Sequence, residues 1–235
     1  MPLQTLEPKR LYRQIADQLR TLIASGEFAA GARLPAERDL ARQLGVSRPS
    51  VREALIALEV EGRVEVRTGS GVYVLDRSQR SAAPIEALGW GPLELIRARR
   101  LVEGETAAQA ATSARRADRE AIARAVDDMR EQAARGIAPL EADRAFHVAI
   151  VQAGANTVLV ETVQGYLDSR HGALFKRLGG YFETDRSWQA AIAEHAKVQV
   201  AIEARDPEAA RAAMHEHLDR AHQRFSASWR RAHAP

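Results

Sequence analysis

Apolar side chains recur at helical spacing from the beginning of the chain onward. The first such segment covers residues 11–24, and its apolar face is formed by Leu11, Ile15, Leu19, Leu22 and Ile23. This segment stops near Gly26. A second helix is predicted over about residues 36–44, because Pro35 suits a first helical turn and Gly45 suits a left-handed terminating residue.

A third helix and two strands complete this part of the chain. Ser47 can cap the helix and Gly62 ends it, with buried positions at Val51, Ala54, Leu55 and Leu58. Residues 63–67 alternate between polar and apolar side chains, residues 68–71 are turn-forming, and residues 72–75 provide a second strand. Two helices, a turn, a third helix and a hairpin are the layout of a winged helix-turn-helix.

In the remainder of the chain, apolar side chains recur at helical spacing and no strand pattern is found. Residues 77–84 carry no such pattern and end in Pro84, as expected of a linker. Helices are then predicted near residues 92–113, 117–135, 139–153, 156–179, 186–204 and 207–229. We therefore expect a mostly α protein, with a winged helix-turn-helix over residues 1–76, a linker over 77–91 and an all-helical antiparallel bundle over 92–235.

The composition excludes several classes of protein. Of 235 residues, 46% are hydrophobic and 28% charged, which is typical of a folded soluble domain. Because the chain has no cysteine, disulfides, thiolate metal sites and thiol nucleophiles are all excluded. No apolar stretch approaches the roughly 18 residues of a membrane span, and no signal-peptide pattern is visible. A cytoplasmic protein without membrane partners is expected.

The net charge of +3 decides little, but the placement of the arginines is informative. Arg38, Arg42, Arg48 and Arg52 surround the predicted turn, with no acidic residue between Asp39 and Glu53. Arg48 and Ser50 open the third helix, where side chains can meet base edges and unpaired N–H groups can hold a phosphate. Arg67 and Gly69 form a hairpin tip able to reach a neighbouring groove. The alternative is an ordinary solvated basic face.

Three later helices direct polar side chains into their apolar faces. Asp143 and His147 lie one turn apart in the apolar arc of 139–153, and His195 and His217 lie in the arcs of their own helices. Burying such groups without partners costs several kcal/mol each. Each histidine alone could be a core residue bonded to a backbone carbonyl. Together the four residues can chelate one divalent cation, and oxygen and imidazole ligands suit Zn²⁺, Ni²⁺ or Mn²⁺.

The segment LPAERDLARQLGVSRPSVREALIALEVEGRVEVRTGSGVYV resembles the DNA-binding domain of the GntR superfamily, over about residues 9–75. The resemblance rests on the elements PAER, SRPSVREAL and GSGVYV, which occur together at the family's spacing. It implies double-stranded DNA as the partner, with contacts from Arg38, Arg48, Ser50, Arg52 and Gly69. Pro49 stands where relatives often have a hydroxyl residue, so one phosphate contact is in doubt.

Residues 92–228 resemble the FadR-type (FCD) effector-binding domain. Its D-x3-H, a later histidine and a histidine in HxHL match Asp143, His147, His195 and His217. The resemblance implies that Arg99, in the pattern Arg-x3-Glu, faces a cavity and pairs with a carboxylate effector, whereas the alternative is a surface salt bridge with Glu103. Asn156 is a second candidate effector contact, or else only a helix cap.

Together these features predict a DNA-binding regulator rather than an enzyme. We expect a homodimeric repressor on a palindromic operator, released by a small organic acid at the metal site. EALIALEVEGRVEVRTGSGVYVLD resembles hexuronate-type regulators, which favours a sugar acid. The alternatives are a metal-dependent hydrolase fused to a DNA-targeting domain, for which no general base or nucleophile motif is found, and a FadR-like regulator with an acyl-chain pocket. In a regulator with an acyl-chain pocket, other residues would stand in place of these four polar core residues.

Overall fold

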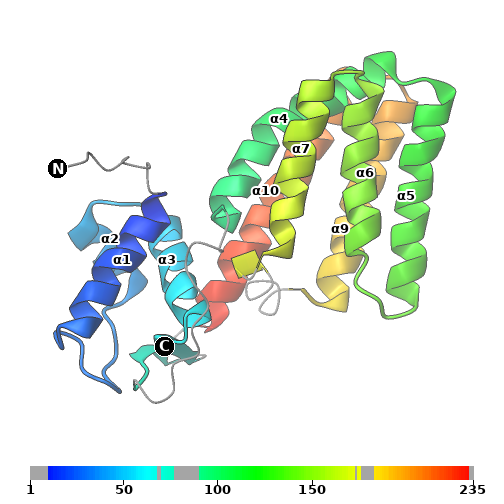
Figure 1. Ribbon diagram of the computed structural model, residues 1–235. Coiled ribbons are helices and arrows are strands. Elements are labelled where there is room, and N and C mark those ends of the chain that lie inside the picture. The colour runs from blue at the N-terminus through cyan, green and yellow to red at the C-terminus, as the bar shows by residue number, and fades with distance from the viewer. Residues whose placement is uncertain (1–9, 68–69, 77–89, 173, 176–182, 233–235) are drawn as a thin grey trace, which may run out of the picture. The chain divides into compact units, whose positions relative to one another are not determined.

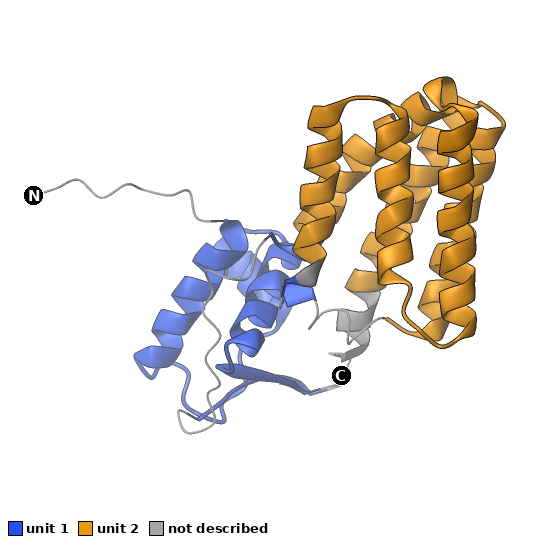
Figure 2. Ribbon diagram, turned by 45° about the vertical axis from the view of Figure 1, so that its right-hand side comes forward, with its two compact units in different colours: residues 1–92, 172–178, 228–235 blue, residues 93–171, 179–227 orange. Residues whose placement is uncertain are grey.

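The structure is a computed structural model, which describes residues 10–67, 70–76, 90–172, 174–175 and 183–232. The chain divides into two compact units (Figure 2). One is formed mainly by residues 1–92, with short additions from 172–178 and 228–235. The other is formed by residues 93–171 and 179–227. The mostly helical fold with one small hairpin agrees with the predicted fold class.

The first unit has the predicted order of elements. Its helices and strands are α1 (Leu11–Ala24), α2 (Glu37–Leu44), α3 (Arg48–Val60), β1 (Val64–Arg67) and β2 (Gly71–Val74). α3 packs against α1 and α2, and its buried residues Val51, Ala54, Leu55 and Leu58 are the ones expected from the sequence. The strands pair antiparallel, with Val64 opposite Val74. These elements form the winged helix-turn-helix.

Local signals set the ends of α2 and α3. Gly45 ends α2 in a left-handed conformation with φ of 65°, which a residue with a side chain adopts only at a steric cost. The Ser47 hydroxyl accepts a hydrogen bond from the Ser50 N–H and so caps α3. Pro35 lies before α2 rather than in its first turn, because Ala36 is the capping residue. The turn between the two helices lies at Gly45 and Ser47, the terminating and capping residues that the sequence predicts.

The second unit is a helical bundle. Its elements are α4 (Pro92–Ser113), α5 (Arg116–Ala134), α6 (Leu140–Ala153), α7 (Thr157–Asp168), the short 3₁₀ helix η3 (Ser169–His171), α9 (Asp185–Glu203) and α10 (Pro207–Ala232). Figure 1 shows these helices side by side, and α5 packs against both α6 and α9. In the described part of the chain, no helix has the length and apolar character of a membrane span.

One predicted helix is shorter than expected. The sequence pattern extends from residue 156 to residue 179, but α7 ends at Asp168, η3 follows it, and residues 174–175 are helical again. At this point the Ser169 hydroxyl donates to the Gly165 carbonyl at 2.8 Å, which offers the backbone a competing partner. Residues 176–182 lie outside the described part of the chain. The early end of α7 matters because it places Arg170 on η3.

Two helices of the bundle approach each other closely. A side chain at Gly104 of α4 would collide with the His215 ring of α10. On either side of this contact, Arg100 donates to Asp219 at 2.7 Å, and Arg211 donates to Glu105 at 2.8 Å. The pairing of earlier α4 residues with later α10 residues shows that the two helices run antiparallel. α10 is thereby held along the helix that also carries Arg99.

Candidate metal centre and nucleic-acid interface

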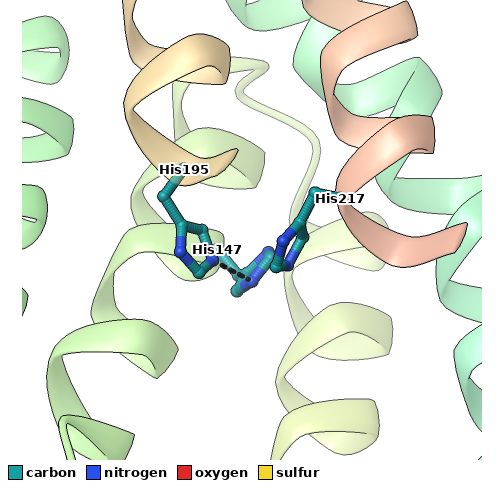
Figure 3. A group of neighbouring side chains, drawn as sticks. All are labelled: His147, His195 and His217. Carbon is teal, nitrogen blue, oxygen red and sulfur yellow. Dashed lines mark hydrogen bonds between the residues drawn. The ribbon is translucent and has the colours of Figure 1, made fainter. Parts of the chain in front are cut away.

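Three histidines from three helices meet inside the bundle (Figure 3). His147 comes from α6, His195 from α9 and His217 from α10, and their rings point toward one another. One ligand nitrogen from each lies within 4.8 Å of the other two, and the Nε2 atoms of His147 and His195 are 3.3 Å apart. Two ligands of a tetrahedral ion with bonds of about 2.0 Å are separated by about 3.3 Å. The cluster has the dimensions of a metal site.

Asp143 adds an oxygen to this cluster from the preceding turn of α6. Its Oδ1 lies 3.3 Å from His195 Nε2 and 4.0 Å from His147 Nε2. All four side chains are buried, with His195 at 0% exposed. The structure therefore brings together Asp143, His147, His195 and His217, the four residues that the sequence proposes as ligands.

Burial and neighbouring charges set the protonation states that a cation requires. Burial lowers the pKa of His195 well below 6.5, and it also lowers the pKa of His217 against the opposing effect of Glu194. Burial alone would raise the pKa of Asp143, but the charge of the Arg170 guanidinium brings it far below the usual range of a carboxyl group. Neutral imidazoles beside an ionised carboxylate are the forms that bind a divalent metal. The donor set therefore fits such an ion.

Two buried glutamates lie next to the Nδ1 atoms of His147 and His217. Glu103 Oε2 lies 2.6 Å from His147 Nδ1, and Glu194 Oε2 lies 3.0 Å from His217 Nδ1. Burial would raise the pKa of Glu194, but hydrogen bonds from His217 and Arg224 lower it to about 2. Glu103 is ionised as well, because Arg99 and His147 hold its pKa well below the ordinary value against the effect of burial.

Sequence reasoning missed Glu194 and considered Glu103 only as a partner of Arg99. A signal for Glu194 was present, since it lies at helical spacing from the buried residues Ala191, Val198 and Ala201 of α9. Arg170, which pairs with Asp143 Oδ2, was also missed. It lies on η3, within the stretch predicted as continuous helix, so no periodic pattern marked it.

Arg99 makes the salt bridge with Glu103 that the alternative interpretation expected, although not at the surface. It is 5% exposed and donates to Glu103, with Nε 2.5 Å from Oε1. The pair is buried, since Glu103 is 2% exposed. Because Arg99 is held by two bonds to this glutamate, binding a ligand carboxylate would require it to share or leave its partner. Its role as an effector contact stays a prediction.

Asn156 is separate from this cluster. It is the N-cap of α7, it is exposed, and its Oδ1 accepts a hydrogen bond from the Leu159 N–H at 3.2 Å. This geometry is that of a helix cap. The side chain is engaged as the helix cap that one interpretation of the sequence expected, and its role as an effector contact stays a prediction.

In the first unit, Arg38 and Arg48 are exposed, as their predicted role in DNA binding requires. Arg38 of α2 has a side chain that is 79% exposed, with Asp39 as a distant partner at 3.7 Å. Arg48, at the start of α3, is 53% exposed and donates to Glu37 at 2.8 Å. An exposed guanidinium at the start of a recognition helix can exchange such a surface partner for a base or a phosphate.

Arg52 and Ser50 are less accessible than predicted. Arg52 is 4% exposed and donates two hydrogen bonds to Glu37, at 2.9 and 3.1 Å. Ser50 is 8% exposed, and its hydroxyl lies 2.8 Å from that of Ser47. Arg52 lies on the face of α3 that packs on α2, which explains its burial. In this structure both residues hold the motif together, and a direct DNA contact would require each to leave its present partner.

The hairpin carries the remaining predicted contact residues. Arg67 of β1 is 53% exposed, donates to Glu65 at 2.8 Å and lies over the ring of Tyr73, 4.5 Å from its centroid. Gly69 lies outside the described residues. Arg67 is thus accessible but held against its own hairpin.

Comparison with known proteins assigns both units to described families. Residues 11–74 match the bacterial regulatory proteins of the gntR family, and residues 94–220 match the FCD domain. The Exu regulon transcriptional regulator of Escherichia coli K12 is 37% identical over 223 residues, which cover 92% of this chain and 85% of that protein. The Uxu operon transcriptional regulator of the same organism is 35% identical and covers 92% of this chain and 87% of its own length.

A solved structure gives a further comparison at the level of the fold. E. coli McbR/YncC has a TM-score of 0.51 and 20% sequence identity, with 93% of this chain and 98% of that chain covered. At this identity the likeness supports the arrangement of helices and strands alone.

Proposed function

This chain belongs to the GntR family of bacterial regulatory proteins and carries an FCD domain, and we propose that a small organic acid bound at a metal ion in that domain controls its binding to DNA. The family and the relatives are transcriptional regulators, so this protein is a transcriptional regulator and the hydrolase alternative has no support. The meeting of three buried histidines and Asp143 is the observation that carries the proposal.

Asp143, His147, His195 and His217 would hold one Zn²⁺, Ni²⁺ or Mn²⁺ ion. These metals accept imidazole and carboxylate ligands, and the set contains no sulfur. A bound ion would supply a positively charged centre, and an ion that expands beyond these four ligands to five or six would accept a further oxygen ligand. The acyl-chain alternative has no support here, because the four polar residues occupy the core of the bundle.

The charges around the cluster favour an anionic effector. Three guanidinium groups, those of Arg99, Arg170 and Arg224, pair with three carboxylates, those of Glu103, Asp143 and Glu194. With neutral histidines the paired side chains therefore carry no net charge. A divalent ion added to this set leaves an excess of positive charge in a buried site, which one or two carboxylates of a ligand would offset.

A sugar acid is the proposed effector. The support is the resemblance to hexuronate-type regulators, together with relatives whose names refer to the Exu regulon and the Uxu operon. With Arg99 and Asn156 engaged elsewhere, the metal itself would be the principal contact for the ligand carboxylate.

In the DNA-binding domain, Arg38, Arg48 and the N–H groups at the start of α3 would bind DNA, and Arg67 with Gly69 would approach a neighbouring groove. We propose that two copies of the chain act as a homodimer on a palindromic operator in the cytoplasm, where a bacterial regulator meets its DNA. Repression would be relieved when the effector favours an arrangement of the two DNA-binding domains that no longer fits both half-sites.

A thermal-shift screen of small organic acids tests this proposal. The full chain is loaded with Zn²⁺, and each acid is added with and without a chelator. An acid at about 100 times its Kd adds about 2.7 kcal/mol to the free energy of unfolding, and we expect the gain only in the metal-loaded protein. The same acid should release operator DNA in a binding assay.

Asn156→Ala is the matched control for this screen. The variant should lose about 1 kcal/mol of stability with its helix cap and keep its full response to the acid. Stabilisation that is unchanged by the chelator, or no response to any acid in the metal-loaded protein, would contradict the proposed function.

A further inference from the structure

The same series of contacts, from an arginine through a glutamate to a histidine, occurs at two of the three histidines. Arg99 donates to Glu103, which faces His147 Nδ1, and Arg224 donates to Glu194, which faces His217 Nδ1. We infer that Glu103 and Glu194 are positioning residues, which fix His147 and His217 with the proton on Nδ1 and the lone pair of Nε2 directed to a common cation. The inference rests on the proposed metal site and names residues beyond its four ligands.

The chemistry of the carboxylate determines which nitrogen carries the proton. A carboxylate that accepts hydrogen bonds from an arginine through both of its oxygens has no proton to donate, so the Nδ1 that faces it, at 2.6 Å in His147 and 3.0 Å in His217, is satisfied only as the N–H. A neutral imidazole with its proton on Nδ1 has its lone pair on Nε2. The Nε2 atom of His147 is indeed the one that lies 3.3 Å from Nε2 of His195. The carboxylate therefore selects the tautomer and the ring orientation at once.

The arginines explain how these glutamates can be ionised in the interior. Glu103 and Glu194 are both 2% exposed, and a carboxylate so buried keeps its charge only beside a cationic partner. Arg224 donates to both oxygens of Glu194, at 2.6 and 2.9 Å, and Arg99 donates to both oxygens of Glu103. A protonated glutamate could donate to Nδ1 and would allow the opposite tautomer. Each arginine thus keeps its glutamate in the form that orders the histidine.

His195 shows what the cluster looks like without such a partner. Its Nδ1 is buried and, like that of His147, makes no hydrogen bond of good geometry among the described residues, but it also has no carboxylate as near as the Glu103 oxygen that lies 2.6 Å from His147 Nδ1. Its ring is instead held by packing, with Phe146 at 4.7 Å between ring centroids. The carboxylate partners are therefore specific to His147 and His217, and these two rings are the ones that depend on charge for their orientation.

The alternative is that the glutamates only satisfy buried polar atoms and contribute to folding. That role predicts a loss of stability in the metal-free protein and no selective effect on metal binding. A positioning role predicts a loss of metal affinity in a variant that is folded, together with altered ligand geometry. Metal affinity and the spectrum of a bound ion distinguish the two roles.

The experiment uses the full chain and the variants Glu103→Gln and Glu194→Gln. Glutamine retains the size of the side chain and an acceptor oxygen, but it carries no charge to hold the arginine. Glu203→Gln, on the exposed side of α9 with Arg119 as partner, is the matched control. Zn²⁺ affinity is measured by competition with a chromophoric chelator, Co²⁺ binding by visible absorption, and folding of the metal-free protein by circular dichroism.

We expect each of the two variants to lose about 10–100-fold in Zn²⁺ affinity and to change the visible spectrum of bound Co²⁺, while the control changes neither. If either variant is unfolded, Arg224→Gln takes its place, because Arg224 touches Glu194 without touching a histidine of the cluster. It should give a smaller loss in the same direction.

Two results would overturn the inference. Folded variants that bind Zn²⁺ within about threefold of the unmodified chain, with the same Co²⁺ spectrum, would show that the glutamates serve folding alone, and the proposed function would stand. An unmodified chain that binds neither Zn²⁺ nor Co²⁺ would remove the metal site itself, and with it both the proposed function and this inference.

Discussion

The two domains of this protein use charged residues in opposite ways. In the DNA-binding domain, Arg38 and Arg48 remain largely in solvent, with side chains 79% and 53% exposed. In the helical domain, the charged groups nearest the cluster are buried and paired, as in Arg99 with Glu103. A surface that binds a polyanion needs accessible cations that exchange partners easily. A site for a small ion needs groups that are desolvated and fixed in advance.

This contrast has consequences for the effects of substitutions. Removing an exposed arginine should change DNA affinity and leave stability nearly unchanged, since surface ion pairs contribute about 0–1 kcal/mol. Removing one partner of a buried pair leaves the other charge uncompensated, which costs about 3–5 kcal/mol. Function and stability should therefore separate for the exposed Arg38 and Arg48 of the first domain and be coupled for the buried pairs of the second.

The largest expected effect is the loss of metal from ligand variants. His147→Ala and His217→Ala each remove a nitrogen from the cluster, so Zn²⁺ affinity should fall by more than the about 10–100-fold expected of the positioning residues. Metal content is measured by mass spectrometry after dialysis, and operator binding without effector should be retained. A full complement of metal in both variants would contradict the assignment of these ligands.

The DNA-binding domain should respond to Arg48→Ala with a selective loss of operator affinity. A base contact contributes about 1–3 kcal/mol to the binding free energy. Arg38→Ala, by contrast, should weaken binding to all sequences and lower the slope of log affinity against log salt concentration by about 1. Fluorescence anisotropy with operator and unrelated DNA at several salt concentrations measures both. If the Arg48→Ala variant bound the operator within about threefold of the unmodified chain, Arg48 would not be a base contact.

Arg52→Ala tests the one buried arginine of the recognition helix. Because its two bonds to Glu37 hold α3 against α2, the variant should lose about 1–3 kcal/mol in the free energy of unfolding, measured by urea denaturation. Arg48→Ala is the comparison, and its stability should be nearly unchanged. If Arg52→Ala kept its stability and still lost operator affinity, Arg52 would act as a direct DNA contact.

Acidification should destabilise the metal-free protein. The pKa of His195 and that of His217 are lowered in the fold, so the unfolded chain binds more protons as the pH falls below about 6.5. The stability that comes from keeping them neutral is thus complete above that pH and is lost below it, by up to about 1.4 kcal/mol per pH unit for each group. Glu194, with a pKa of about 2, adds a further loss between about pH 5 and pH 2.

Thermal unfolding with a chelator across this range measures the effect. The midpoint should fall steadily from pH 7 to pH 5. A midpoint that is constant or rises over this window would contradict the sign of the histidine shifts. Zn²⁺ should flatten the dependence near neutral pH, because a bound ion keeps the imidazoles unprotonated.

The same contrast between the domains explains how much the sequence could predict. The first domain is specified by local signals, such as Ser47 at a helix start, Gly45 in a left-handed turn and strict alternation in the hairpin, and the structure confirms these elements. In the helical domain, periodicity correctly placed His147, His195 and His217 on inward faces. It could not show that they meet, because a helical wheel gives the face of a residue and not the helix that it faces.

What the sequence missed has a physical cause as well. Glu194 owes its role to partners on another helix at specific heights along the bundle, and no spacing rule contains that information. The Arg99–Glu103 pair follows helical spacing, but the spacing does not show that the pair is buried. The position of Arg170, which pairs with Asp143, depends on the early end of α7. At this end the Ser169 hydroxyl competes for the Gly165 carbonyl. Buried ion pairs are thus the part of this protein that a one-dimensional pattern describes least well.

X-ray diffraction at the zinc absorption edge, from crystals of the full chain grown with Zn²⁺, tests the central claim most directly. We predict one anomalous peak per chain inside the helical domain, about 2.0–2.2 Å from an oxygen of Asp143 and from one nitrogen each of His147, His195 and His217. A crystal that contains zinc but shows no peak there, or a peak that contacts fewer than three of these residues, would contradict it.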